Sequence, residues 1–232
     1  MKRVLISLSI LCILAAVAAA DYIDLPVKWS QPYDPQYRGW LSDCTGTEIQ
    51  ADDFECRDPD PIVAVRWWGV YWGEVDPRDP AYKDFHISFH LSTGQHPDSI
   101  PGALIELYDV VAQESFTGDY ESSGGFAIYR YDAYLREAFD QWLYSQSPEN
   151  EIPGELWIDI CQPSGEDWCW MESGTYNLDY PAFSFDGHNG PWASASGDPD
   201  LAFELMTVPE PATMALLGLG LAGLVMRHRR KK

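Results

Sequence analysis

Hydrophobic and polar residues alternate with a period of two along several stretches of the chain. In the clearest stretch, Phe85, Ile87, Phe89 and Leu91 alternate with histidines and serines. Because successive side chains of a β-strand point to opposite faces, this pattern predicts a strand with one buried face. Similar patterns predict further strands at residues 103–111, 113–118, 126–132, 156–160, 182–185 and 201–205.

Two other stretches complete the pattern. Residues 62–72 are apolar on both faces, which predicts a central strand or one partly covered by a loop. Residues 133–144 fit a helical stripe loosely and are the only helix we expect in the middle of the chain. Turn-forming Gly, Pro and Asp residues separate the predicted strands. Together these features predict an all-β, two-sheet sandwich, jelly-roll-like or immunoglobulin-like.

The first twenty residues have the three parts of a secretory signal peptide. Lys2 and Arg3 precede an apolar run, and three alanines end at Ala20. Small residues at this place suit signal peptidase, and the apolar run is short for a membrane anchor. We therefore predict that residues 1–20 are a signal peptide that signal peptidase removes; a retained N-terminal anchor is the alternative.

The end of the chain combines an apolar stretch with a basic tail. Residues 212–226 are almost entirely apolar, which predicts a transmembrane helix. This stretch covers about 22 Å of a hydrocarbon layer about 30 Å thick, so the helix is barely long enough. The basic residues after it should stop transfer, with the tail in the cytoplasm and the large domain outside. These membrane-stop residues are Arg227, Arg229, Arg230, Lys231 and Lys232.

A short motif, Pro209, Glu210 and Pro211, directly precedes this apolar stretch. The order of motif, apolar helix and basic tail closely resembles the PEP-CTERM sorting signal of exosortase-bearing bacteria. The resemblance covers residues 208–232. It implies that the precursor lies in the inner membrane, that an exosortase removes the tail, and that the product reaches the cell envelope or the extracellular space. An ordinary single-pass anchor after a Pro-Glu-Pro linker is the alternative.

Removal of both ends leaves residues 21–207, which we predict to be a single acidic domain. The whole chain has 36 acidic and 15 basic residues, a formal net charge of -21. Such a negative surface repels a phosphate backbone, so nucleic acid is excluded as a partner. Aromatic residues make up 14% of the chain, and they supply enough apolar surface for a folded core.

Four cysteines remain after export: Cys44, Cys56, Cys161 and Cys169. In an oxidising compartment this number predicts two disulfides, for which three pairings are possible. We expect Cys44 with Cys56 and Cys161 with Cys169, because each pair is close in sequence and flanks a turn-rich loop. A zinc site is the competing use, although no Cys-x-x-Cys spacing occurs.

Several short segments also resemble a secreted domain family without an assigned function that is common in exosortase-bearing bacteria. The resemblance spans nearly all of the mature chain. It implies a β-sandwich at the cell surface and brings no catalytic residues. The segments that carry it are residues 28–32, 51–54, 66–69, 87–90 and 200–203.

Histidines and aspartates are the candidate metal ligands. His86 and His90 share one strand face, but they are about 13 Å apart and cannot bind one ion, so we expect a solvent-facing or loop-covered pair. Carboxylates in tight Asp-Pro turns suit calcium better, and we expect no cofactor other than such a structural calcium ion. The candidate calcium ligands are Asp58, Asp60, Asp198 and Asp200.

Aromatic side chains are the remaining candidates for binding. Trp68, Trp72 and Trp157 could form an exposed platform that stacks against sugar rings. Nucleophile and metalloprotease motifs are absent from the sequence, so we predict no catalytic residue. The leading hypothesis is a non-enzymatic protein of the cell surface or extracellular matrix that binds polysaccharide or calcium. The alternative is a secreted, glycoside hydrolase-like enzyme that uses a carboxylate pair.

Overall fold

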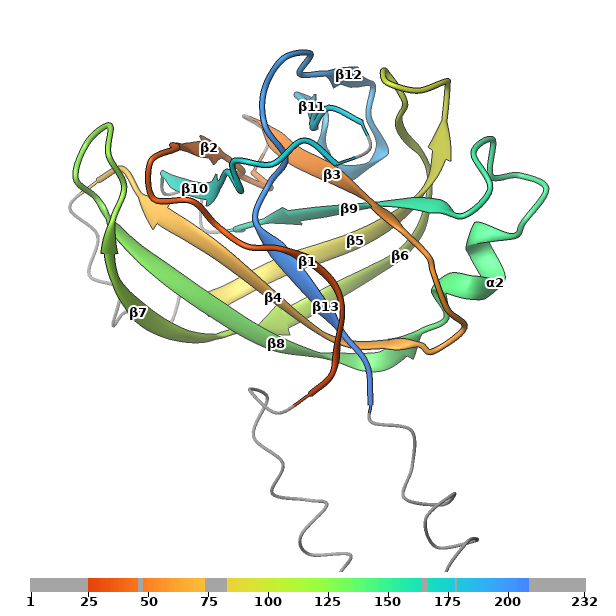
Figure 1. The fold of residues 1–232 in the computed structure, drawn as a ribbon, viewed down its shortest axis with the longest axis horizontal. Helices are drawn as coiled ribbons and strands as arrows, with labels where there is room; N and C mark the ends of the chain where they lie inside the picture. The colour runs from red at the N-terminus through yellow and green to blue at the C-terminus, as the bar shows by residue number, and fades with distance from the viewer. Residues whose placement is uncertain (1–24, 46–47, 74–82, 164–166, 178, 209–232) are drawn as a thin grey trace, which may run out of the picture. The chain divides into compact units, whose positions relative to one another are not determined.

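The computed structural model describes residues 25–45, 48–73, 83–163, 167–177 and 179–208. Residues 27–207 form two antiparallel sheets (Figure 1). This confirms the predicted all-β fold with two sheets. The predicted signal peptide, Pro-Glu-Pro motif, transmembrane helix and basic tail lie outside the described residues. Within the described part of the chain, no helix is long and apolar enough to cross a membrane.

The first sheet is centred on β4, the strand predicted at residues 62–72. β4 pairs with β13 and β10 along one edge and with β8 along the other. β1 pairs with β13, β2 with β10, and β7 with β8. The bounds are β1 Val27–Gln31, β2 Gly39–Leu41, β4 Ile62–Tyr71, β7 Gln113–Tyr120, β8 Ala127–Phe139, β10 Trp168–Met171 and β13 Phe203–Met206.

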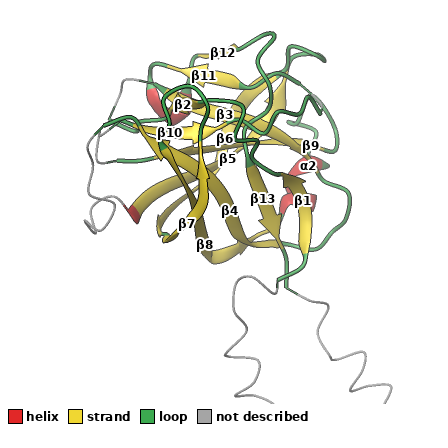
Figure 2. Ribbon diagram, turned by 60° about the vertical axis from the view of Figure 1, so that its left-hand side comes forward, coloured by secondary structure: helices red, strands yellow, loops and turns green. Residues whose placement is uncertain are grey.

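The second sheet has the strand order β12-β11-β3-β9-β5-β6. Figure 2 shows β11 and β12 beyond β3, at one end of this sheet. Its strands are β3 Ile49–Glu55, β5 Asp84–Thr93, β6 Ile100–Val111, β9 Glu155–Cys161, β11 Ala182–Ser184 and β12 Trp192–Ser194.

The main core lies between the two sheets and is rich in aromatic rings. Phe85 of β5 meets Trp67 of β4 and Trp168 of β10 edge-on, with ring centroids 5.1 and 5.0 Å apart. All four apolar residues of the alternating stretch in β5 belong to this core, as predicted. Edge-on contacts between aromatic rings stabilise the fold by more than the burial of their apolar surface alone.

The helix predicted at residues 133–144 is wrong. β8 continues to Phe139, and only the short helix α2 (Gln141–Ser145) follows it. Ala133 and Leu135 are buried whereas Tyr134 is exposed, which is the period of a strand. Pairing of Ala133, Tyr134 and Phe139 with β4 outweighs the weak helical stripe.

The predicted disulfide pairing is also wrong. Cys44 pairs with Cys161, 117 residues away, whereas Cys56 and Cys169 are buried free thiols. The seven residues of β3 lie between Cys44 and Cys56 and span roughly 20 Å. Cys161 and Cys169 belong to different sheets. Closeness in sequence therefore failed as a guide, because extended strands separate the local pairs.

Candidate functional site

One face of β9 carries a row of functional side chains. Because side chains alternate along a strand, residues 156, 158 and 160 lie in the core between the sheets. The opposite, outer face carries Glu155, Trp157, Asp159 and Cys161. All four are buried, although they point away from the main core.

Residues 179–198, the covering segment, pack over this outer face. Ala182 and Trp192 of the covering segment form a second apolar cluster with Trp157. The ring of Trp192 also meets His90 edge-on, with centroids 5.5 Å apart. His90 is therefore fully buried, as expected for a loop-covered residue, whereas the side chain of His86 keeps 29% exposure.

At the first end of β9, Glu155 meets His96 and Asp179. One potential ligand atom from each of these three residues lies within 4.8 Å of the others. His96 Nδ1 is 2.7 Å from Asp179 Oδ2, and its Nε2 is 3.4 Å from Glu155 Oε2. Asp53 adjoins them, because its Oδ1 accepts a hydrogen bond of 3.4 Å from the backbone N–H of Asp179. These four residues are termed the acidic group.

Serine hydroxyls provide hydrogen bonds to the acidic group, but too few. Ser92 donates to Glu155 Oε1, and Ser99 Oγ lies 2.8 Å from that same oxygen and 2.5 Å from Asp179 Oδ2. A hydroxyl has one hydrogen, so Ser99 can donate to only one of the two carboxylates. Among the described residues, Asp53 Oδ2, Glu155 Oε2 and Asp179 Oδ1 are buried and accept no hydrogen bond.

Negative charge is therefore unfavourable in the acidic group. Burial raises the pKa of Asp53 well above its ordinary value, and the charges of Glu155 and Asp179 raise it further. Burial also raises the pKa of Glu155, although hydrogen bonds from the two serines oppose this effect. Either a retained proton or a bound cation can relieve this repulsion.

A hollow of about 290 Å³ opens beside the acidic group. It is lined by Pro97, Tyr176, Asp179 and Tyr180. Tyr176 is 60% exposed, and the side chain of His96 is 51% exposed. The buried carboxylates thus lie next to solvent rather than deep inside the protein.

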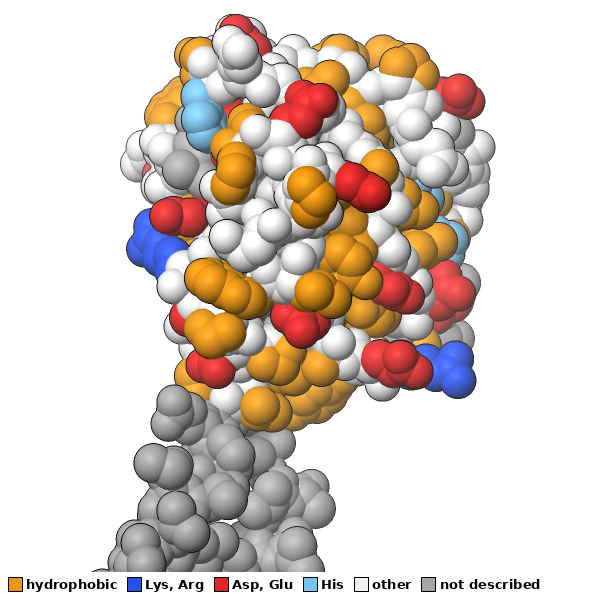
Figure 3. Space-filling view, turned by 90° about the vertical axis from the view of Figure 1, so that its right-hand side faces the viewer, with side chains coloured by type: hydrophobic (Ala, Val, Ile, Leu, Met, Phe, Trp, Pro, Cys, Tyr) orange, Lys and Arg blue, Asp and Glu red, His pale blue; other side chains and the backbone are white. Residues whose placement is uncertain are grey.

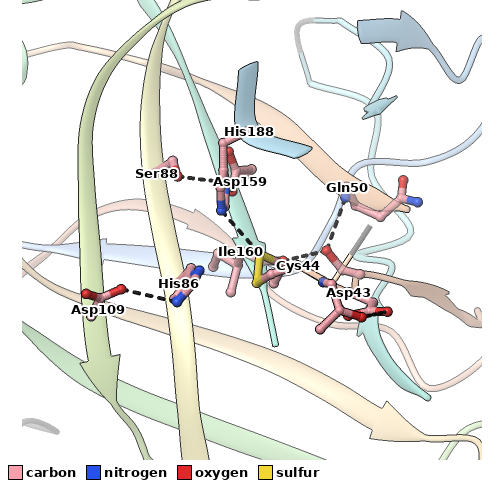
Figure 4. Close-up of a disulfide and its surroundings, with 12 residues drawn as sticks. Asp43, Cys44, Gln50, His86, Ser88, Asp109, Asp159, Ile160 and His188 are labelled. Carbon is pink, nitrogen blue, oxygen red and sulfur yellow. Dashed lines mark hydrogen bonds and ion pairs between the residues drawn. A yellow bond between two sulfur atoms is a disulfide. The ribbon is translucent and has the colours of Figure 1, made fainter. Parts of the chain in front are cut away.

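At the second end of β9, the disulfide lies beside two histidines (Figure 4). β5 places His86 opposite Cys161 in the strand ladder. The short helix η3 (Gly187–Asn189) places His188 Nε2 3.7 Å from Cys161 Sγ. One potential ligand atom from each of Cys44, Cys161, His86 and His188 lies within 4.8 Å of the others. These four residues are termed the sulfur–histidine group.

Asp159 lies on the same strand face between the two groups and bridges two histidines. Its Oδ1 is 2.8 Å from His188 Nδ1, and its Oδ2 is 2.6 Å from His90 Nε2. Burial alone would raise the pKa of Asp159, but the hydrogen bonds to His188 and His90 outweigh burial and lower it. The same contact raises the pKa of His188 against the effect of burial.

Ser88, His188 and Asp159 are neighbours, but they are not arranged as a catalytic triad. Ser88 Oγ lies 2.9 Å from His188 Nδ1, the same nitrogen that contacts Asp159. In a triad, serine and aspartate contact opposite nitrogens of the ring, so that the ring can take a proton from serine. Ser88 is also fully buried, so this cluster offers no accessible nucleophile.

The structure does not bring the predicted tryptophan platform together. Trp157 is fully buried in the second sheet, and Trp68, on β4 of the first sheet, is 7% exposed. Trp72 alone is substantially exposed, at 44%. A platform of these three rings is therefore wrong, because packing covers two of them. On the face seen in Figure 3, hydrophobic side chains are interspersed with acidic ones.

The aspartates predicted for calcium lie elsewhere. Lys28 Nζ is 2.5 Å from Asp58 Oδ1 and donates to the carbonyl of Asp60. Asp200 is fully buried, and burial raises its pKa to about 6. None of these residues, nor Asp198, belongs to a metal-ligand grouping in the described part of the chain.

Sequence reasoning missed the acidic group because its members come from four separate segments. Asp53 lies in β3, His96 in the loop between β5 and β6, Glu155 in β9, and Asp179 in the covering segment. The sequence contained a signal only for the neighbouring Asp159, which alternates with apolar residues in the strand predicted at residues 156–160. Carboxylates at such positions need partners from elsewhere in the chain.

Comparison with known families gives two matches. Residues 27–206 match a family model described as "Domain of unknown function (DUF7901)". Residues 207–231 match the "PEP-CTERM protein-sorting motif". No curated protein and no solved structure is significantly similar to the chain. Both family matches agree with the resemblances seen in the sequence, and the second implies export, transient membrane anchoring and processing by an exosortase.

Proposed function

The chain belongs to the DUF7901 family, and for this exported protein we propose a non-enzymatic role in the cell envelope or extracellular matrix, based on binding a divalent cation. The acidic group is the proposed site, and calcium is the proposed ion. The observation that carries the proposal is the set of three buried carboxylate oxygens without hydrogen-bond donors.

The donors of the acidic group favour a hard cation. Carboxylate oxygens are the ligands that calcium and manganese prefer, and calcium tolerates irregular coordination. Glu155 and Asp179 would provide the direct ligands, and water in the adjoining hollow could complete the shell. His96 already contacts Asp179, so it can hold that carboxylate in place.

The enzyme alternative has less support from the same residues. A glycosidase needs two carboxyl groups that flank the scissile bond, about 5 to 10 Å apart. Glu155 and Asp179 instead contact one hydroxyl, that of Ser99, which lies between them. Their side chains are only 4% and 0% exposed, so a sugar could not enter between them without rearrangement.

Calcium binding can be tested by isothermal titration of the purified protein after removal of metal with a chelator. We expect one calcium ion per chain and a higher melting temperature, because an ion that binds only the folded state stabilises it. Glu155→Gln should abolish the binding. Glu151→Gln is the matched control, since Glu151 is an exposed carboxylate outside the acidic group. Absence of calcium binding, or equal binding by both variants, would refute the proposal.

Polysaccharide is a second proposed ligand, supported by the hollow beside Asp179. The exposed ring of Tyr176 lines this hollow together with Tyr180, and tyrosine rings stack well against sugars. A glycan array probed with and without calcium tests this idea. We expect Tyr176→Ala to weaken any glycan binding and to leave calcium binding unchanged. If the array shows no binding, calcium would be the only proposed ligand left.

A further inference from the structure

The sulfur–histidine group supports an inference that does not depend on the calcium proposal. We propose that Cys44, Cys161, His86 and His188 form a zinc site when the disulfide is reduced. Cys44 and Cys161 would then be linked either directly, by the disulfide, or through a shared zinc ion. The sequence spacing concealed this site, because its ligands come from four separate parts of the chain.

The donor set and its geometry fit zinc. Two thiolates and two imidazoles are a common tetrahedral set for structural zinc. Zn–S bonds of about 2.3 Å and Zn–N bonds of about 2.0 Å place the donor atoms roughly 3.3 to 3.8 Å apart. Here one potential ligand atom from each residue already lies within 4.8 Å of the others, and Cys161 Sγ is 3.7 Å from His188 Nε2. Once the S–S bond opens, small side-chain movements suffice.

Carboxylates orient both histidines in the way typical of zinc ligands. Asp159 holds His188 through Nδ1 at 2.8 Å, which leaves Nε2 facing the sulfur. Asp109 contacts His86 Nε2 at 3.2 Å. Figure 4 shows the opposite edge of the His86 ring turned toward the disulfide. Such carboxylate partners fix the ring and increase the basicity of the free nitrogen.

The backbone holds Cys161, His86 and Cys44 near one another without the disulfide. Cys161 and His86 are neighbours in the β9–β5 ladder. The backbone N–H of Cys44 donates to the carbonyl of Gln162 at 3.2 Å. Cys44 is partly exposed, so a reductant can reach its sulfur. Ligands carried by paired strands should therefore stay close together after reduction.

The chemistry balances with a dithiol as the reductant. The dithiol supplies two electrons and two protons, becomes a disulfide itself, and leaves Cys44 and Cys161 as thiols. Zn²⁺ then displaces the two thiol protons and forms two Zn–S bonds. Because export leads to an oxidising compartment, the disulfide is the resting form, and zinc binding would mark reducing conditions.

The test compares zinc binding by the oxidised protein and by the dithiol-reduced protein. The dithiol is removed under exclusion of air before zinc is added. A chromogenic chelator competes with the protein for zinc and reports how much zinc the protein binds. We expect the reduced protein to bind one more zinc ion than the oxidised protein. Zinc that both forms bind equally belongs to another site, such as the acidic group. This amount is subtracted from the zinc bound by the reduced protein. Cobalt in place of zinc should give the visible and thiolate charge-transfer bands of a tetrahedral site.

Variants identify the ligands. His86→Asn and His188→Asn should each lower the zinc affinity of the reduced protein at least tenfold, whereas Cys56→Ser and Cys169→Ser should not. If reduction loosens the fold, zinc should restore the near-ultraviolet circular dichroism. The proposal is overturned if reduction adds no zinc site and zinc restores no structure. It is also overturned if the added zinc is insensitive to both histidine variants.

Discussion

The two ends of β9 lie on one strand face and under one covering segment, yet the buried polar side chains at the two ends have different kinds of partner. At the first end, Glu155 joins two further carboxylates, and these acids are contacted by serine hydroxyls, one backbone N–H and a half-exposed histidine. At the second end, Cys161 is closed covalently by Cys44, and Asp159 has a histidine on each oxygen.

The difference shows which conditions each end responds to. The acidic group has more negative charge than internal partners can neutralise, so protons and cations should change its stability. In the sulfur–histidine group, Cys44 and Cys161 are already joined to each other. We expect that only reduction of this disulfide makes their sulfur atoms available to other partners. One strand thus carries two proposed sites of opposite character, with Trp157 between their members Glu155 and Cys161.

The largest expected effect on stability comes from replacing Trp157. Trp157 is fully buried, and its Nε1 donates to Ser92 Oγ at 3.2 Å. Trp157→Ala should lower the free energy of unfolding by about 3 to 5 kcal/mol, because it leaves a large cavity. Urea unfolding measures the loss. Trp72→Ala, at a half-exposed ring, is the control and should cost much less; equal losses would show that the outer face is not tightly packed.

The next effect separates the two ends directly. Replacement of Cys44 and Cys161 by serine should lower the free energy of unfolding by about 2 to 5 kcal/mol, because the crosslink closes a long loop in the unfolded chain. Calcium affinity should remain within about twofold of the wild-type value, since the acidic group is at the other end of the strand. A variant that loses calcium binding while still folded would mean that the two ends are coupled.

Opposite pH dependence should distinguish the two ends. The raised pKa of Glu155 gives stability below about pH 4 that is lost as pH rises through the folded pKa. The lowered pKa of Asp159 gives stability above about pH 4 that is lost as pH falls through the folded pKa. The raised pKa of His188 adds stability below about pH 6.5 that is lost as pH rises through that pKa.

Urea unfolding of calcium-free protein between pH 3 and pH 8 tests these signs. Asp159→Asn should cost about 2 kcal/mol near pH 5 to 6 and less at both extremes, since it weakens hydrogen bonds to a charged group. Glu155→Gln should become steadily more stable relative to wild type as pH rises. Parallel pH profiles of the two variants would contradict the comparison.

The smallest expected effect is that of His86→Ala in the oxidised protein. His86 contacts Asp109, whose side chain is 84% exposed, and such surface pairs contribute at most about 1 kcal/mol. The melting temperature should therefore hardly change. A loss comparable with that of the disulfide variant would show that His86 supports the fold even when no metal is bound.

Local patterns in the sequence predicted most of the strands correctly. Alternation in β5 and the apolar run of β4 depend on side-chain periods that a single strand reveals. Pairing with β4 makes residues 133–139 part of a strand, and a local pattern does not contain that information. The disulfide prediction failed for the same reason, because Cys44 and Cys161 are 117 residues apart and only the tertiary fold brings them together.

The candidate sites were less accessible to sequence reasoning. Trp157 looked like an outward ring because the alternation of β9 gave no sign of the covering segment. Glu155 and Asp179 are ordinary acids in an acidic chain until the fold brings them to one serine. The C-terminal sorting signal was easier to identify, because the order of its parts along the chain is itself the signal.

The pairing of β1 with β13 affects how the protein matures. Val27 lies opposite Met206, so the chain enters and leaves the sandwich at adjacent points. The covering segment lies at the far side of the fold from these strand ends (Figure 1). Removal of the sorting motif at residues 207–231 would therefore begin next to these strand ends, and we expect it to leave the acidic group undisturbed. A metal ion bound before this processing step should therefore stay with the protein.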